Sequence, residues 1–455
     1  MGKGSDAIGS PWIGRALLLA VAFSASFAPW PASALPSFAQ QTGMPCAQCH
    51  TVGFGPALTA YGREFKLNGY VFGDVGAFAP LALMAQGGYA ETGGDQPSPP
   101  AAHTSVNGNL SLDQASLFLA GRITEHLGAF AQMTYSGAER RTTWDNVDVR
   151  YARGLTFGNI GIVAGVSVNN NPTVQDLWNS TPAWGFPYIS SALAPTPTAG
   201  PVIGGLGGAV LGATAYAMID QHLYIEAGGY RNVSDRWLSN VGLSADDSAH
   251  VSGVAPYWRA AWQSGTDDRQ WSVGTFGMRT DLQPDPTVPA TDRYTDVGID
   301  ATYTQGGARR HSLAANIAVI REHQSLGASF AAGGSDAVAN DLTAFHADVT
   351  YSFRRSWAGS AGLFSTTGTT NTALYAPAPL TGSNNGSPDS RGYTLQLEWI
   401  PFGQTNSYLR PWVNVRIGLQ YVGYTTFNGG ATNYDGSGRA ASDNNTLFAY
   451  FWVIG

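Results

Sequence analysis

The two cysteines of this chain lie three positions apart, in the run Cys46-Ala47-Gln48-Cys49-His50, and the chain has no others. A Cys-x-x-Cys-His run is the attachment motif of c-type haem. Its two thiols form thioethers with the two vinyl groups of one porphyrin, and the histidine that follows is placed as the proximal iron ligand. We therefore expect Cys46 and Cys49 to bind one haem c covalently and His50 to ligate its iron.

Two other interpretations of the same residues stay open. The cysteines could form a structural or redox disulfide, as in thioredoxin-like proteins, although no βαβ pattern surrounds them. They could also be half of a zinc site, although the chain has no second cysteine pair and no histidine follows at ligand spacing.

The sequence leaves the sixth ligand of the iron open. Met44 lies only two residues before the first cysteine, too close to reach the opposite face of the porphyrin. The other candidates are Lys66, Met84, His103, Met133 and His346. Each also has an ordinary explanation, as a wall residue of the fold, a solvated charge or a loop side chain.

Residues 1–34 are expected to be a secretory signal peptide. Lys3 and Arg15 precede an apolar run that ends near Ala28, and Ala32-Ser33-Ala34 supplies a small-residue cleavage site. The run is too short to span a bilayer as a helix, and no later segment offers about 18 consecutive apolar residues. Export agrees with the motif, because haem c is attached outside the inner membrane.

The composition excludes several classes of protein. Only 12% of the residues are charged, about half the usual share of roughly 25%. This disfavours a soluble helical enzyme, which would be rich in Glu and Lys. Disorder is disfavoured because the chain has 13 Trp, 20 Tyr and 20 Phe to bury. A net charge of -7 excludes a basic nucleic-acid-binding protein.

From about Phe78 onward, apolar and polar residues alternate with a period of two. In the segment 393–399 the odd positions are Tyr, Leu, Leu and Trp, and the even positions are Thr, Gln and Glu. Such alternation is typical of transmembrane barrel strands, apolar toward lipid and polar toward the lumen. A soluble sandwich or propeller is the alternative, with an apolar interior and a more average charge content.

Aromatic residues near the ends of these segments favour the membrane, because they suit an interfacial girdle. They are Trp144, Tyr303, Trp357, Trp399 and Trp412. The end of the chain departs from the pattern. Outer-membrane barrels commonly finish on an aromatic residue, whereas this chain finishes on Gly455.

About sixteen alternating segments occur, so we predict an all-β fold, an antiparallel outer-membrane β-barrel of about sixteen strands over residues 78–455. The predicted strand starts are Ala79, Leu110, His126, Trp144, Gly158, Gly208, Gln221, Ser252, Arg269, Arg293, Arg310, Leu342, Ser356, Ser390, Arg410 and Asn444. Residues 35–77 form the c-type haem-binding segment, which is too small to bury a core of its own. We expect it to plug the lumen or its periplasmic mouth.

Several charged residues should face the lumen if the alternation holds. They are Asp148, Arg150, Asp296, Asp300, Asp348, Glu398 and Arg416. The acidic members could concentrate a cation such as ferrous iron, since a field of that sign raises local cation concentration. The other interpretation is that strand charges simply pair across the wall of a polar interior.

The N-terminal segment resembles a known family. The residues that carry the resemblance are Pro36-Ser37-Phe38-Ala39, Gln41-Thr42-Gly43-Met44, the Cys-x-x-Cys-His run, and Gly62-Arg63-Glu64-Phe65-Lys66-Leu67-Asn68-Gly69-Tyr70. They are similar to the fused cytochrome–porins of the outer membrane, whose best-known members are the monohaem iron-oxidising cytochromes of ferrous-iron-oxidising bacteria. Family members tend to carry Arg where this chain has Gln40.

The resemblance implies that Cys46 and Cys49 bind haem c and that His50 ligates its iron. It implies electron transfer across the outer membrane of a Gram-negative bacterium, from an extracellular donor to a periplasmic cytochrome or copper protein. Ferrous iron is one candidate donor, which would make the protein an Fe(II) oxidase, but many family members have no established donor. The alternative is an outer-membrane transport channel in which the haem segment is a structural plug or a redox gate.

Overall fold

The computed structural model describes residues 37–455 except 74–80, 235, 237–249, 267, 307–309, 376–381, 405–406, 408 and 410–412. The predicted signal peptide, the predicted strand starts at Ala79 and Arg410, and Trp412 lie outside the described residues.

The described residues form sixteen antiparallel strands that close into one barrel, with β1 paired to β16. The strands are β1 (Leu81–Thr92), β2 (Asn109–Arg122), β3 (Leu127–Ser136), β4 (Arg141–Phe157), β5 (Ile160–Asn169), β6 (Val210–Ile219), β7 (Leu223–Asn232), β8 (Ala255–Thr266), β9 (Arg269–Leu282), β10 (Asp292–Gln305), β11 (His311–Ser325), β12 (Ala339–Phe353), β13 (Trp357–Gly368), β14 (Ser390–Trp399), β15 (Asn414–Thr426) and β16 (Thr446–Ile454). The predicted fold class is confirmed. Each predicted strand start within the described residues falls within three residues of the observed one.

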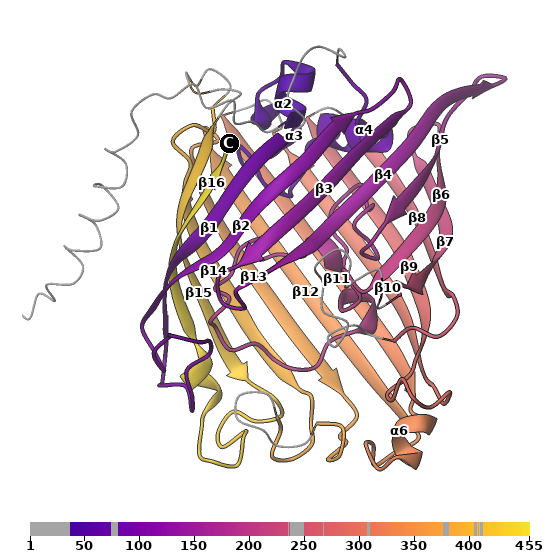
Figure 1. Cartoon of the computed structure of the whole chain (residues 1–455). Coiled ribbons are helices and arrows are strands. Elements are labelled where there is room, and N and C mark those ends of the chain that lie inside the picture. The colour runs from indigo at the N-terminus through magenta and orange to yellow at the C-terminus, as the bar shows by residue number, and fades with distance from the viewer. Residues whose placement is uncertain are drawn as a thin grey trace, which may run out of the picture.

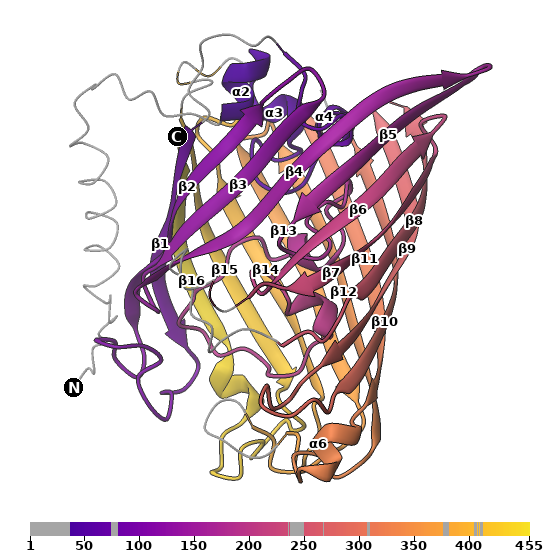
Figure 2. The same cartoon turned by 45° about the vertical axis from the view of Figure 1, so that its right-hand side comes forward.

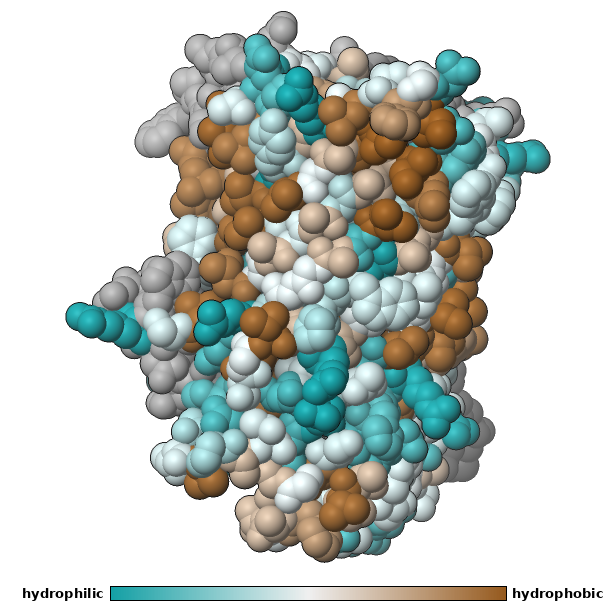
Figure 3. All heavy atoms as spheres, turned by 90° about the vertical axis from the view of Figure 1, so that its right-hand side faces the viewer, coloured by the Kyte–Doolittle hydropathy of each residue, from teal (hydrophilic) through white to brown (hydrophobic). Residues whose placement is uncertain are grey.

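The two faces of the strands separate apolar from polar residues as the alternation predicts. On β10, Val297 and Ile299 are 48% and 61% exposed on the outside, whereas Asp296 and Asp300 are each 1% exposed inside. On the face shown in Figure 3, hydrophobic residues gather over the strands and hydrophilic residues gather toward one end. An apolar outer wall around a polar interior is the arrangement of a membrane-spanning barrel of the outer membrane, and it excludes the soluble sandwich.

Aromatic residues mark one rim of this apolar wall. Trp357 and Trp399 are paired across β13 and β14 and stack with ring centroids 6.1 Å apart. Trp271 opposite Tyr303 continues the row on β9 and β10. All of these residues lie where the short connections join the strands, as expected of an interfacial girdle.

The end of the chain fits the barrel although it lacks a terminal aromatic residue. Phe448, Tyr450 and Trp452 of β16 face the interior and are buried, whereas Leu447 and Phe451 face outward. Gly455 still exchanges two backbone hydrogen bonds with Leu83 of β1, 2.6 and 2.8 Å long. The seam between the first and last strands is therefore paired to its end.

Three short helices lie together at the end of the barrel where the C-terminus lies (Figures 1 and 2). They are α2 (Ser37–Thr42), α3 (Cys46–Cys49) and α4 (Ala60–Leu67). Another helix, α6 (Gly327–Ala331), lies at the opposite end, with the long connections. Within the described residues, no helix is long and apolar enough to cross a membrane.

We call the described residues 37–73 the plug. Its own core is one aromatic cluster, in which the ring of Phe38 contacts Phe65 at 4.9 Å and stacks on Tyr70 at 5.2 Å. Phe65 also contacts Phe72. The plug also makes hydrogen bonds to the barrel wall, among them those from Arg150 and Arg416, as expected for a segment too short to fold alone.

A second segment, residues 170–209 between β5 and β6, also enters the barrel; we call it the inner loop. It contains two 3₁₀ turns, η1 (Pro182–Trp184) and η2 (Val202–Gly204). Leu177, Ile203 and Leu206 of this loop are at most 1% exposed, which is unusual for a connection between strands.

Candidate functional site

The short helix α3 holds both cysteines. Pro45 precedes it with an extended backbone, φ -67° and ψ 151°, which suits a proline at the start of a helix. His50 ends the helix, and its backbone N–H donates to the Cys46 carbonyl over 3.0 Å. Residues three positions apart lie on the same side of a helix, so the two thiols share one face of α3. Both cysteines are free and partly buried.

The neighbouring helix α4 fixes the position of α3. Thr59 caps α4, since its side chain accepts from the Gly62 N–H over 3.2 Å. The same hydroxyl donates to the Gln48 carbonyl over 2.6 Å, and the Thr59 N–H donates to the Cys49 carbonyl over 2.9 Å. Gly62 permits this close packing, because a Cβ there would lie 2.3 Å from the Cys49 oxygen.

His50 carries a buried ring nitrogen, Nδ1, that has no hydrogen-bond partner among the described residues. Burial, together with the nearby Arg416 guanidinium, lowers the pKa of His50 to about 4, against the opposing effect of the Gly55 and Ala57 carbonyls. The imidazole is therefore neutral near pH 7, which is the form that ligates metals.

The two thiols are also held in their neutral form. Burial raises the pKa of Cys46 to about 11 and that of Cys49 to about 12. Reactive redox cysteines have lowered pKa values, so the thioredoxin-like interpretation finds no support here. The zinc interpretation gains nothing either, because no group of three or more His, Cys, Asp or Glu side chains in the described part of the chain could hold a metal ion.

Two neutral thiols on one helical face, followed by a neutral imidazole with an orphaned nitrogen, fit the donor set of a c-type haem. A small cavity of about 10 Å³ lies beside Cys46, with Phe402, Gly403 and Asn414 in its wall. Cofactor pockets are usually about 300–1,000 Å³, so this cavity is too small to hold a porphyrin.

Arg416 of β15 anchors the plug close to the cysteines. Its guanidinium donates to the carbonyl oxygens of Val52, over 3.4 Å, and of Phe54. It also pairs with Glu398 at 3.1 Å and lies over the rings of Phe54 and Trp452 at 4.8 and 4.9 Å. Because Arg416 is 2% exposed, these contacts are shielded from water and hold the plug against the wall.

A second anchor, on β4, holds the C-terminal part of the plug. The Tyr70 hydroxyl donates to Asp148 over 2.6 Å, and Arg150 pairs with the same carboxylate at 2.7 Å. Arg150 also donates to the Lys66 carbonyl over 3.2 Å. From β6, the Tyr216 hydroxyl donates to the Leu67 carbonyl over 2.8 Å.

Lys66 connects the plug to the inner loop. Its ammonium group donates to the carbonyl oxygens of Val174, over 2.8 Å, and Asp176, over 2.5 Å, and to Asn179 Oδ1 over 2.9 Å. Asn179 returns a bond to the Pro56 carbonyl over 2.6 Å. Burial, together with the Arg150 guanidinium, lowers the pKa of Lys66 to about 7, against the opposing effect of the neighbouring carboxylates.

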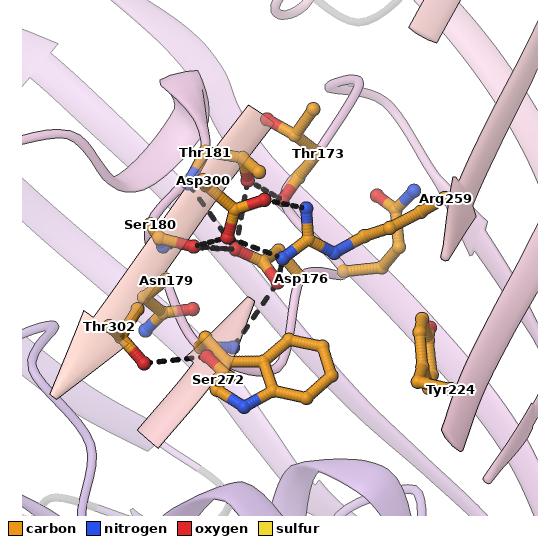
Figure 4. A network of polar contacts seen from close by, with 12 residues as sticks. Thr173, Asp176, Asn179, Ser180, Thr181, Tyr224, Arg259, Ser272, Asp300 and Thr302 are labelled. Carbon is orange, nitrogen blue, oxygen red and sulfur yellow. Dashed lines mark hydrogen bonds and ion pairs between the residues drawn. The ribbon is translucent and has the colours of Figure 1, made fainter. Parts of the chain in front are cut away.

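The inner loop is in turn fixed to the barrel wall by a buried network (Figure 4). Arg259 of β8 donates two hydrogen bonds of 2.9 Å to Asp300 of β10, and it pairs with Asp176 of the inner loop at 3.1 Å. Ser180 donates to Asp300 over 2.6 Å, and Thr181 donates to Asp176 over 3.0 Å. The plug, the inner loop and the wall therefore form one connected set of polar contacts.

The predicted lumen-facing charges are all buried inside the barrel. Ion pairs join Asp148 to Arg150, Asp300 to Arg259 and Glu398 to Arg416, which favours pairing over an open acidic path at these positions. The sequence analysis named neither Arg259 nor Asp176. Arg259 stands at an odd, inward-facing position of an alternating segment and could have been found, whereas a loop residue such as Asp176 carries no such signal.

The candidates for the sixth ligand are placed as follows. Lys66 is engaged by the inner loop, and Met44 is exposed. His103 lies in the connection between β1 and β2, while Met133 and His346 lie in β3 and β12. Met84 belongs to the hydrophobic cluster against which Cys46 packs.

No protein-family model and no curated protein sequence matches this chain. Several solved outer-membrane proteins match this chain in shape. OmpF of Salmonella typhi, in complex with daunomycin, is 13% identical, with a TM-score of 0.46, and the match covers 82% of this chain and 97% of that one. The anion-selective porin from Comamonas acidovorans is 12% identical, with a TM-score of 0.41 and coverages of 82% and 98%.

OmpT, an outer-membrane protein of Vibrio cholerae, is 10% identical, with a TM-score of 0.41 and coverages of 82% and 95%. The fold of this chain is the closed barrel of sixteen antiparallel strands described above. At these identities the likeness concerns the barrel and does not extend to the plug's cysteines or to a cofactor.

Proposed function

We propose that this protein is an outer-membrane electron carrier in which a porin-like barrel holds one haem c. Cys46 and Cys49 would bind the haem covalently, and His50 would be its proximal iron ligand. The observation that carries the proposal is the position of this motif. The Cys-x-x-Cys-His run stands in a plug that buried arginines of the barrel fix inside one mouth.

When bound, haem c supplies a one-electron Fe(III)/Fe(II) couple. The donor loses one electron and a periplasmic cytochrome or copper protein gains it, so the exchange is balanced without an oxygen atom or a proton. The residues of this chain position the group: α3 presents both thiols on one face, Arg416 fixes the following Val52–Phe54 turn, and burial keeps the His50 imidazole neutral.

The location of the plug limits the donor. Short connections of outer-membrane barrels face the periplasm, and the plug lies at that end. A redox group there stands next to a periplasmic partner but across an apolar band about 25 Å tall from the outside. A small soluble donor that enters the lumen, such as ferrous iron, suits this arrangement better than a large particle.

A second function is supported at least as well by the barrel itself. A porin-like barrel with an inner loop is the architecture of a transport channel, and the comparisons concern that part of the chain alone. In this function the plug is a structural stopper or a redox gate. The specific observation in its favour is Lys66, which couples the plug to the inner loop by three hydrogen bonds.

The test begins with the full chain, made in cells that attach haem c, exported, and purified in detergent. We expect haem stain on the full-length band after a denaturing gel, retained in Met44→Leu and lost in the double variant C46S/C49S. A colourless protein would overturn the haem proposal. Oxidation of ferrous iron by the stained protein, without ion conductance in planar bilayers, supports the carrier. Conductance that persists in C46S/C49S, without iron oxidation, supports the channel.

A further inference from the structure

A second buried cluster lies at the end of the barrel opposite the plug. Asp296 of β10, Glu322 and Gln324 of β11, and Asn340 of β12 all face the interior near the strand ends that join the long connections. The strand register pairs Asp296 with Glu322 and Gln324 with Asn340. Directly opposed side chains on one face of a sheet are within about 5 Å at Cβ, so Asp296 adjoins Glu322, and Gln324 adjoins Asn340. Glu322 and Gln324 are two positions apart on the same face of β11, which joins the two pairs into one patch, with Asp296 and Asn340 at its opposite corners.

Each carboxylate uses one oxygen to hold the inner loop. The Val202 N–H donates to Glu322 Oε2 over 2.6 Å, and the Ile203 N–H donates to Asp296 Oδ2 over 3.0 Å. Both donors come from the turn η2. The remaining oxygens, Asp296 Oδ1 and Glu322 Oε1, are left for the cluster, and Glu322 Oε1 accepts from Gln324 Nε2 over 2.7 Å.

Several polar atoms of this cluster have no partner although they are fully buried. They are Asp296 Oδ1, Gln324 Oε1, and both Oδ1 and Nδ2 of Asn340, among the described residues. The four side chains are between 0% and 5% exposed. Native proteins rarely leave such atoms unpaired, because an unpaired buried polar atom costs about 1–3 kcal/mol.

The negative charges of the Asp296 and Glu322 carboxylates also lack a positive partner among the described residues. Asp148, Asp300 and Glu398 each pair with an arginine, but neither Asp296 nor Glu322 forms an ion pair within the described part of the chain. Two adjacent buried carboxylates need a proton or a cation between them. A shared proton would satisfy the carboxyl pair, yet it would leave the amide oxygens of Gln324 and Asn340 without a partner. A cation between the carboxylates would compensate their charge, and the amide oxygens on the same inner face would be its further ligands.

We propose that Asp296, Glu322, Gln324 and Asn340 form a binding site for a hard divalent cation. Carboxylate and amide oxygens are the ligands that Ca²⁺, Mg²⁺ and Mn²⁺ prefer, and two carboxylates balance the double charge. Because the same carboxylates hold Val202 and Ile203, the bound cation fixes the inner loop to β10 and β11. The site does not depend on haem at the other end of the barrel.

The test counts bound Mn²⁺ by the loss of the free Mn²⁺ electron paramagnetic resonance signal, on full-length protein in detergent that has been stripped with a chelator. We expect the wild type to bind one Mn²⁺ more than the double variant D296N/E322Q. The matched control is D348N, which removes another lumen-facing carboxylate, held by Asn316 over 3.0 Å, and should bind as the wild type does. Absence of Mn²⁺ binding by the wild type, or equal binding by all three proteins, would overturn the site.

The fold of the double variant is checked by the mobility of the unheated protein in a gel. A second variant tests the site even if the double variant misfolds. N340L keeps both carboxylates and removes one neutral ligand, so it should weaken the binding of Mn²⁺ about tenfold. In the wild type, Mn²⁺ should also slow amide hydrogen exchange in residues 202–206. Unchanged affinity in N340L, or exchange that Mn²⁺ does not alter, would contradict the geometry proposed here.

Discussion

Removing Arg416 should release the plug while leaving the barrel intact. In R416Q the plug loses the hydrogen bonds to the Val52 and Phe54 carbonyls and the guanidinium over the Phe54 ring. Hydrogen bonds to charged groups contribute about 1.5–3 kcal/mol each, and a buried cation–π contact contributes about 0.5–2 kcal/mol. These contributions overlap, and glutamine recovers one hydrogen bond. We therefore expect the free energy of opening the plug to fall by about 3 kcal/mol.

That free energy corresponds to a roughly hundredfold increase in the equilibrium constant for opening of the plug, since about 1.4 kcal/mol is a factor of ten. Amide hydrogen exchange followed by mass spectrometry on the detergent-solubilised protein measures it directly. The informative amides are those of Thr51, Thr59 and Arg63, whose partners all lie within the plug. They should exchange roughly a hundredfold faster in R416Q, while peptides from β9 and β10 keep their wild-type rates.

The matched control is R293Q. Arg293 also pairs with a carboxylate, Asp281 at 2.8 Å, but it is 49% exposed and does not touch the plug. An exposed pair contributes less than about 1 kcal/mol, so plug exchange should not change. The reasoning fails if R416Q alters plug exchange by less than threefold, or if plug and barrel peptides accelerate together.

Three further predictions concern α4. G62A should separate α3 from α4, because its Cβ would lie 2.3 Å from the Cys49 oxygen, and protease cleavage within the plug should accelerate; G154A, where nothing lies within 4 Å, should behave as wild type. Lys66 has a pKa of about 7 in the folded protein, below the 10.5 of the unfolded chain. Between these pH values the unfolded state binds more protons than the folded state, so the folded plug gains stability as pH rises. Protection of the plug amides from hydrogen exchange should therefore increase from pH 7 toward pH 10. A fall in protection over that range, after correction for intrinsic exchange, would contradict the burial of this ammonium. K66M should abolish this pH dependence and accelerate exchange in the inner loop, which an inner loop held independently of the plug would not do.

The barrel could be predicted because each strand repeats the same physical rule. One face meets lipid and the other a polar interior, so a period of two is written into every segment, as Val297 and Ile299 against Asp296 and Asp300 illustrate. Strand starts were less exact, since β4 begins at Arg141 and β12 at Ala339, before the alternation becomes regular. Polar residues at the rim of the barrel are compatible with either a strand or a loop, so the sequence does not mark where the strand begins.

The interior could be predicted only in part. The motif Cys46–His50 is local, so its chemistry is visible in the sequence, and the need for a plug follows from its small size. The anchors are not local. Lys66 was considered as an iron ligand or a solvated charge, but it binds carbonyl groups more than a hundred residues later. Such partners are specified by the closed barrel, which brings distant strands around one lumen.

The meeting of β16 with the plug has a consequence for biogenesis. Trp452 contacts Phe54 edge to face at 5.2 Å, and Tyr450 donates to Glu398, the counter-ion of Arg416. The last strand synthesised thus completes both the cylinder and the seat of its stopper. A chain that ended before residue 446 would lack the strand that pairs with both β1 and β15, and its plug would lose the contact with Trp452.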